Sequence, residues 1–182
     1  MLEIRVHGRG GQGAVVASKI LADAIAREGK FVQAFPEFGV ERRGAPVTAF
    51  IRVSDDIIYV RSKIYTPDHL LVLDPTLVDA VNILEGLKKG GWIVINTVRK
   101  PEEMGFPADY KVATVDATSI AIEHRLGSKV SPIVNTAILG ALVKVLGIVS
   151  LPSLLEAIRE GVPIKPDANV KAAEQAYNSV IM

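Results

Sequence analysis

The sequence contains no cysteine. This excludes disulfide bonds, and it excludes thiolate ligation of an iron–sulfur cluster by this chain. Its three histidines, His7, His69 and His124, do not have the spacing of metal ligands, so we predict no metal site. If the protein works beside iron–sulfur clusters, another chain must supply their ligands.

Net charge and aromatic residues are also scarce. The formal net charge is +1 and aromatic residues make up 5% of the chain, which excludes the basic surface of a typical nucleic-acid-binding protein. The apolar run 133–151 is interrupted by Asn135, Thr136 and Lys144, so it predicts a buried helix and no membrane span. The chain starts on a strand pattern without a signal peptide, and we therefore expect a cytoplasmic protein.

What the chain has is length and apolar content. Its 182 residues are 49% hydrophobic, enough for one sizeable core, and no linker interrupts them. We predict a single domain over residues 1–182.

Apolar runs at 69–73, 92–95 and 111–115 alternate with helical patterns, which is typical of parallel strands in an α/β fold. The strand predicted at 47–53 follows that at 31–36 after a loop too short for a helix, so it should run antiparallel to its neighbour. Ser54-Asp55-Asp56 predicts a turn into a hairpin strand at 57–60. The expected fold is an open, mostly parallel, Rossmann-like sheet with an antiparallel hairpin portion and a helical C-terminal third.

Helix boundaries follow from capping patterns. We expect helices at 14–28, 75–89, 117–126, 131–146, 153–161 and 167–181. Asp74 should cap the second of these and Gly147 should end the fourth, while Ser153 and Glu156 have the spacing of a capping box.

A glycine-rich stretch separates the first strand pattern from the first helix pattern. Gly8, Gly10 and Gly13 satisfy G-x-G-x-x-G, a spacing that permits a tight turn and close approach of the backbone to a phosphate. The stretch predicts an anion site at a helix N-terminus, a dinucleotide site, or a tight turn with no ligand. The dinucleotide interpretation lacks its acidic partner, because the second strand closes with Phe35-Pro36 and Glu37 comes only afterwards.

Other polar residues are expected at the same edge of the sheet. Asp74, Asn96-Thr97 and Asp116 each come at the end of a predicted parallel strand, although helix capping alone would explain the two aspartates. Phe35-Pro36, at the end of the second strand, should lie at the same edge. Arg42 and Arg43 follow the second strand closely, and their guanidinium groups suit phosphate or carboxylate. Solvated surface charge is the alternative. No complete catalytic triad or carboxylate pair is evident.

Several motifs together resemble one family over essentially the whole chain. They are His7-Gly-Arg-Gly-Gly-Gln-Gly13, Phe35-Pro-Glu-Phe-Gly39, Glu41-Arg-Arg-Gly-Ala-Pro46, Leu73-Asp-Pro-Thr-Leu77, and Asn135-Thr136 before a glycine-containing helix. This set is similar to the gamma subunit of pyruvate (2-oxoacid):ferredoxin oxidoreductases. The form of the segment 41–46 favours the pyruvate and branched-chain types.

The resemblance implies a multi-subunit enzyme that converts a 2-oxoacid and coenzyme A to acyl-CoA, CO2 and reduced ferredoxin. Thiamine diphosphate, Mg2+ and iron–sulfur clusters would lie in the alpha, beta and delta partner subunits, since this chain has no cysteine and no Gly-Asp-Gly thiamine motif. The chain would be inactive alone and would contact ferredoxin only through the complex. The alternatives are a free-standing NAD(P)-dependent dehydrogenase and a non-enzymatic nucleotide-binding module. The residues expected to bind coenzyme A or another anion are Gly8, Arg9, Gly10, Gly11, Gln12, Gly13, Arg42 and Arg43.

Overall fold

The computed structural model describes residues 1–37 and 43–182 and contains a six-stranded mixed sheet of order β2-β3-β1-β4-β5-β6. The strands are β1 Leu2–Arg9, β2 Phe31–Pro36, β3 Pro46–Ser54, β4 His69–Val72, β5 Trp92–Asn96 and β6 Lys111–Val115, with a separate hairpin of β7 Gly127–Ser128 and β8 Ser131–Pro132. The helices are α1 Ala14–Arg27, α2 Leu77–Ala80, α3 Ala117–Glu123, α4 Asn135–Leu146, α5 Leu151–Gly161 and α6 Pro166–Ser179, with a 3-10 turn η1 at Pro101–Met104.

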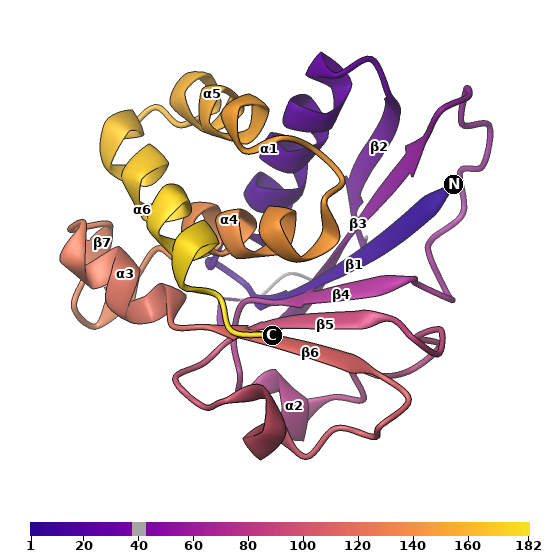
Figure 1. Cartoon of the computed structure of the whole chain (residues 1–182), viewed down its shortest axis with the longest axis horizontal. Helices are drawn as coiled ribbons and strands as arrows, with labels where there is room; N and C mark the ends of the chain where they lie inside the picture. Colours follow the sequence, from indigo (N-terminus) through magenta and orange to yellow (C-terminus); the bar gives the residue numbers. More distant parts are fainter. Residues whose placement is uncertain (38–42) are drawn as a thin grey trace.

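The sheet has a parallel half and an antiparallel half. β1, β4, β5 and β6 run parallel, whereas β3 pairs antiparallel with β1 on one side and with β2 on the other. The long helices α1, α4, α5 and α6 lie together on one face of the sheet, and the short α2 lies on the other (Figure 1). The predicted fold class is therefore confirmed.

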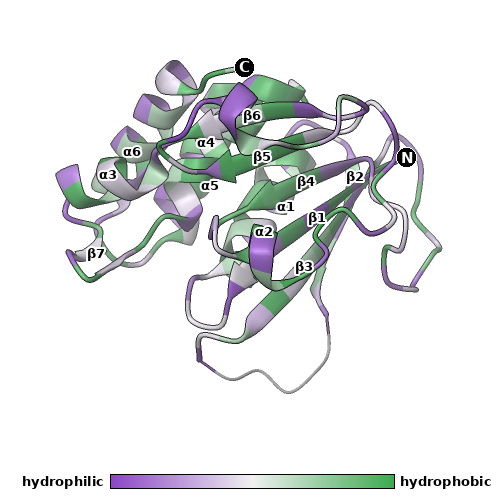
Figure 2. Ribbon diagram, turned by 90° about the horizontal axis from the view of Figure 1, so that it is seen from below, coloured by the Kyte–Doolittle hydropathy of each residue, from purple (hydrophilic) through white to green (hydrophobic). Residues whose placement is uncertain are grey.

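The larger core lies between the sheet and the long helices, and a smaller core lies under α2. Figure 2 shows hydrophobic residues concentrated along the central strands between these layers. α4 is buried from Asn135 to Val143, because α6 packs so closely on it that a Cβ at Gly140 would lie 1.8 Å from the carbonyl oxygen of Ala173. The apolar run is thus a core helix as predicted, and no helix in the described residues is long and apolar enough to cross a bilayer.

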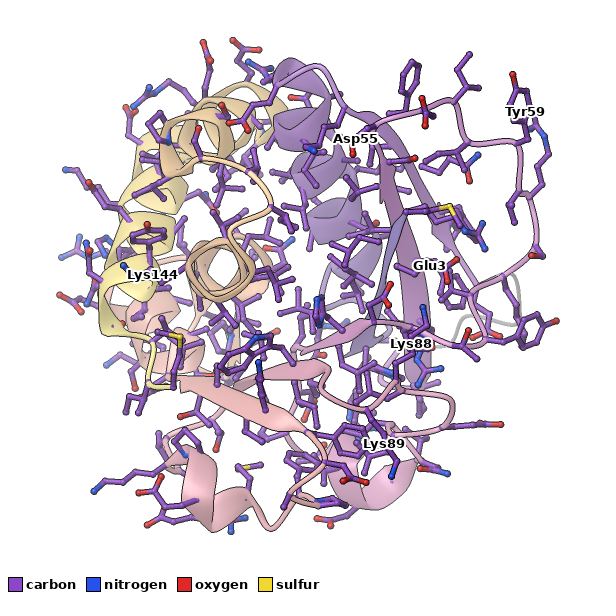
Figure 3. All side chains as sticks on the ribbon, turned by 45° about the vertical axis from the view of Figure 1, so that its right-hand side comes forward. Glu3, Asp55, Tyr59, Lys88, Lys89 and Lys144 are labelled. Carbon is purple, nitrogen blue, oxygen red and sulfur yellow. The ribbon has the colours of Figure 1, made fainter. Side chains whose placement is uncertain are left out.

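The hairpin strand predicted at 57–60 is wrong. The chain after β3 forms a loop in which Tyr59 is 82% exposed and points away from the body of the molecule (Figure 3). β3 already pairs with a strand along each edge, so the following segment has no free edge of β3 to join.

The helix predicted at 75–89 is also wrong in length, because only Leu77–Ala80 is α-helical. Arg5 gives the physical reason: its Nη2 donates to the carbonyl oxygens of Ile83 at 2.8 Å and Glu85 at 2.7 Å. Because these two carbonyl groups point at a buried guanidinium, they do not accept the backbone hydrogen bonds of a continuous α-helix.

Two other helix starts differ from the prediction. α4 begins at Asn135, since Ser131–Pro132 pairs with β7 in the small hairpin. α5 is capped by Ser150, whose Oγ accepts from the backbone N–H of Ser153 at 3.3 Å, so the expected capping box at Ser153 does not form. Gly147 ends α4 in the left-handed conformation, as predicted.

Candidate functional site

The glycine loop joins β1 to α1 in a turn that only glycine fits at its last position. Gly13 has φ +79°, and a Cβ placed on it would lie 2.5 Å from Nδ2 of Asn135. Gly8 lets β1 and α1 approach each other closely, because a Cβ at this position would lie 3.2 Å from the Cβ of Ala14. The glycines therefore provide the tight turn and close packing that the spacing predicts.

The two long side chains of the glycine loop, Arg9 and Gln12, form hydrogen bonds within the protein. Oε1 of Gln12 accepts from the backbone N–H of Arg9 at 2.7 Å, and its Nε2 donates to Oδ2 of Asp74 at 2.8 Å. Arg9 Nε donates to the same oxygen at 3.1 Å, while its Nη1 and Nη2 donate to the carbonyl of Gly44 and the hydroxyl of Thr76. The charge of Arg9 is thus compensated inside the protein.

Asp74 is the acceptor that organises these contacts. Burial opposes ionisation of this carboxyl, but hydrogen bonds from Thr76 and Gln12 outweigh the burial, and the pKa of Asp74 lies below its ordinary value. The sequence predicts Asp74 as a helix cap; instead its Oδ1 accepts from the backbone N–H and the hydroxyl of Thr76. The N-cap of α2 is Thr76.

Arg43 lies against the glycine loop. Gly10 and Arg43 form a bridge in which the N–H of Gly10 donates to the carbonyl of Ala45 at 2.8 Å and the N–H of Gly44 donates to the carbonyl of Gly10 at 3.0 Å. Arg43 is exposed, and no ion pair among the described residues uses it. Arg42, predicted to act with it, lies outside the described residues.

A crevice of about 260 Å³ opens at the carboxyl ends of β1, β4 and β5. It is lined by the glycine loop at Gly11 and Gln12, by Asp74, and by Asn96, so the structure brings these sequence-predicted positions together. Asp116 does not line it and caps α3, its Oδ1 accepting from the N–H of Ser119 at 2.9 Å. The end of β2 is kept away because β3 lies between β2 and β1.

Asn135 also belongs to this site, although the sequence patterns do not predict a contact between Asn135 and the glycine loop. Its Nδ2 lies 3.4 Å from the carbonyl oxygen of Gly13, and it is 6% exposed at the first turn of α4. It couples α4 to the glycine turn. The signal in the sequence is that Asn135 and Thr136 are polar residues within an otherwise apolar run.

His7 borders the loop but is unsuited to acid–base work. Burial, with the charge of Arg5 beside it, lowers the pKa of His7 to about 3. Its Nε2 accepts from Nε of Arg5 at 3.0 Å, so the proton of the neutral ring sits on Nδ1. No group of three or more potential metal ligands comes together in the described residues.

The geometry disfavours the dinucleotide interpretation. Such a site uses an acidic residue at the end of a second strand next to β1. Here the second strand, β2, is separated from β1 by the antiparallel β3, and Glu37 after β2 pairs with Nζ of Lys63 at 3.0 Å.

Comparison with known proteins gives one consistent result. The family model described as "Pyruvate ferredoxin/flavodoxin oxidoreductase" matches residues 3–179. The chain is 53% identical to the pyruvate/ketoisovalerate oxidoreductases common subunit gamma of Thermococcus kodakarensis, covering all of this chain and 98% of that protein. It is 54% identical to the pyruvate synthase subunit PorC of Methanocaldococcus jannaschii, with 100% and 98% covered. The crystal structure of the pyruvate oxidoreductase subunit PORC from Thermotoga maritima superposes with a TM-score of 0.83 at 41% identity, covering 98% of this chain and 96% of that one.

Proposed function

This chain belongs to the pyruvate ferredoxin/flavodoxin oxidoreductase family, and from that premise we propose that it is the gamma subunit of a multi-subunit 2-oxoacid:ferredoxin oxidoreductase. The observation that carries the proposal is identity above half over the full length of subunits named gamma or PorC. The assembled enzyme converts a 2-oxoacid and coenzyme A to acyl-CoA, CO2 and reduced ferredoxin. We propose pyruvate or a branched-chain 2-oxoacid as the substrate, the pair that the Thermococcus relative's name gives.

The cofactors of such a complex do not fit this chain. Iron–sulfur clusters are held by thiolates, and the sequence has no cysteine. We propose that the alpha, beta and delta subunits hold the clusters, thiamine diphosphate and Mg2+, and that electrons reach ferredoxin through them. The gamma chain is then a non-catalytic component, inactive alone. A cytoplasmic location is part of the same proposal, and fractionation of native cells tests it.

For the gamma chain itself we propose a role on the coenzyme A side. Arg43 supports this: it is exposed, it flanks the glycine loop, and guanidinium groups bind phosphate with directed, charge-assisted hydrogen bonds. Arg9 and Gln12 are occupied by Asp74, so we assign them to shaping the loop. We therefore divide the predicted site residues into two groups. Gly8 to Gly13 shape the loop, and Arg42 and Arg43 are the candidate anion ligands.

Kinetics of the assembled complex test this division. Arg43→Ala should raise the KM for coenzyme A by about tenfold, the loss of roughly one charge-assisted hydrogen bond, and should leave 2-oxoacid decarboxylation unchanged. Arg159→Ala, at an exposed arginine on α5, is the matched control. Unaltered coenzyme A kinetics in an intact Arg43→Ala complex would leave Arg43 as solvated surface charge.

The subunit assignment has its own test. Affinity purification of this chain from its native cell should recover thiamine- and cluster-binding chains in fixed ratio. Recovery of the chain alone, with NAD(P)H raising its melting temperature, would instead support the dehydrogenase alternative.

A further inference from the structure

A second hollow adjoins the crevice at Ile133 and lies between the start of α1, the β7–β8 hairpin and the loop joining α5 to α6. It is an apolar groove of about 340 Å³, lined chiefly by Val16, Leu126, Ile133, Val162, Pro163 and Ile164. The hairpin stands at the outer edge of the molecule beside α3 (Figures 1 and 2). We call this hollow the hairpin groove.

Large apolar side chains that line the hairpin groove are exposed to solvent. Ile164 is 73% exposed, Ile133 48% and Val16 46%. Single exposed apolar residues are ordinary, but several around one concave surface indicate an interaction site.

The charges on its rim have one sign. Arg125 and Lys165 line the groove, Lys129 stands at the hairpin turn, and none of the lining residues is a carboxylate. The carboxylate nearest in sequence to Lys165, Asp167, faces Arg159 at 3.4 Å. The groove therefore favours an occupant whose apolar groups are flanked by negative charge.

The backbone of the rim is held in an unfavourable conformation. Arg125 has φ +55° and Lys165 has φ +52°, and these are the non-glycine residues with positive φ in the described chain. Nζ of Lys165 donates to the carbonyl oxygen of Arg125 at 2.7 Å, which ties the two rim positions together. Strain of this kind persists where the surrounding structure fixes it and often marks a functional surface.

The floor of the groove offers little to a polar small molecule. The hydroxyl of Thr136 donates to Oδ1 of Asn169 at 2.6 Å, and Nδ2 of Asn169 donates to the carbonyls of Ile164 and Lys165. Small-molecule sites usually present free polar groups that fix the ligand, whereas these buried groups bind one another. The arrangement suits insertion of apolar side chains from a protein.

We propose that the hairpin groove docks another subunit of the same oxidoreductase, which inserts apolar side chains flanked by carboxylates. The inference rests on the proposed function, which provides such a partner. Ile133 lines both the groove and the crevice at the glycine loop, so a subunit seated here would also border that crevice.

Co-expression of all subunits, with an affinity tag on this chain, tests the docking. Ile164→Asp places a charge in the apolar groove, and Arg125→Glu reverses one rim charge. Each should lower recovery of the partner subunits by about tenfold or more, and the Arg125→Glu defect should diminish at high salt, where screening weakens the rim attraction. Val98→Asp, at a residue that is 79% exposed elsewhere, and Lys171→Glu on α6 are the matched controls and should assemble as the unaltered chain does.

A photo-crosslinking residue at position 164 gives a second measurement that does not depend on weakening the complex. It should crosslink to a partner subunit in the purified complex, and the same residue at position 98 should not. Normal assembly of both groove variants, or a crosslink only to a small molecule or to a second copy of this chain, overturns the docking proposal. Failure of even the unaltered chain to recover partners would instead contradict the proposed function.

Discussion

Replacement of Gly13 by alanine should damage the glycine loop in two separable ways. The residue has φ +79°, a conformation that costs an L-residue about 1–2 kcal/mol relative to glycine. A Cβ there would also lie 2.5 Å from Nδ2 of Asn135, closer than these atoms can approach. Displacing a buried side chain of this kind costs about 1–3 kcal/mol, so the total loss of unfolding free energy should be about 2–5 kcal/mol.

Gly29 provides the matched control. It has φ +81°, but a Cβ built on it meets nothing within 4 Å. Gly29→Ala therefore measures the backbone cost alone, about 1 kcal/mol after allowance for the lower entropy of alanine in the unfolded chain. The difference between the two variants isolates the contact with Asn135.

Urea unfolding of the purified chain, followed by the fluorescence of Trp92, gives these free energies. In a double-mutant cycle with Asn135→Ala, Gly13→Ala should lose most of its excess cost, because the atom that the new methyl group meets is gone. Equal effects of Gly13→Ala and Gly29→Ala, or an excess that survives in the Asn135→Ala background, would refute the proposed coupling between α4 and the glycine loop.

Three further predictions concern other parts of the chain. His7 has its pKa lowered from 6.5 to about 3, so the unfolded chain takes up the proton first and stability falls as pH drops below 6.5. The loss should be about 2 kcal/mol between pH 7 and pH 5, and His7→Gln should abolish that part of the dependence in urea titrations at the two pH values. Arg125→Gly should raise the melting temperature of the isolated chain, since glycine relieves φ +55° by about 1 kcal/mol, and unchanged or lower stability would contradict the strain assigned to the rim. Gly140→Ala should separate α4 from α6, because the new Cβ would lie 1.8 Å from the carbonyl oxygen of Ala173; soluble, natively stable protein would show that the helices can shift.

The features that local sequence determines were predictable. The alternation of apolar and charged residues over 2–6 and the polar stripe at Lys19, Asp23 and Arg27 place β1, the loop and α1 correctly, and the short loop after Pro36 predicts the antiparallel β3. Gly147 is recognisable as a helix end because left-handed backbone strongly favours glycine.

The features that failed depend on residues far apart in the chain. The pairing of Arg9 with Asp74 spans 65 positions, so no local pattern predicts it. Arg5 removes two carbonyls from the predicted helix at 75–89, which no local propensity encodes. The contact of Asn135 with Gly13 likewise arises only when α4 packs against the start of α1.

We propose that this chain completes an oxidoreductase whose redox centres lie in its partner subunits. Reconstitution tests it most directly: the chain, the partner subunits without it, and the mixture are each assayed for viologen dye reduction with 2-oxoacid, coenzyme A, thiamine diphosphate and Mg2+. We expect no reduction by the chain alone, and we expect coenzyme A-dependent acyl-CoA formation to be restored when the chain is added to the partners. Dye reduction by this chain alone, or full activity of the partners without it, would show that the chain is not a redox-inactive subunit of the enzyme.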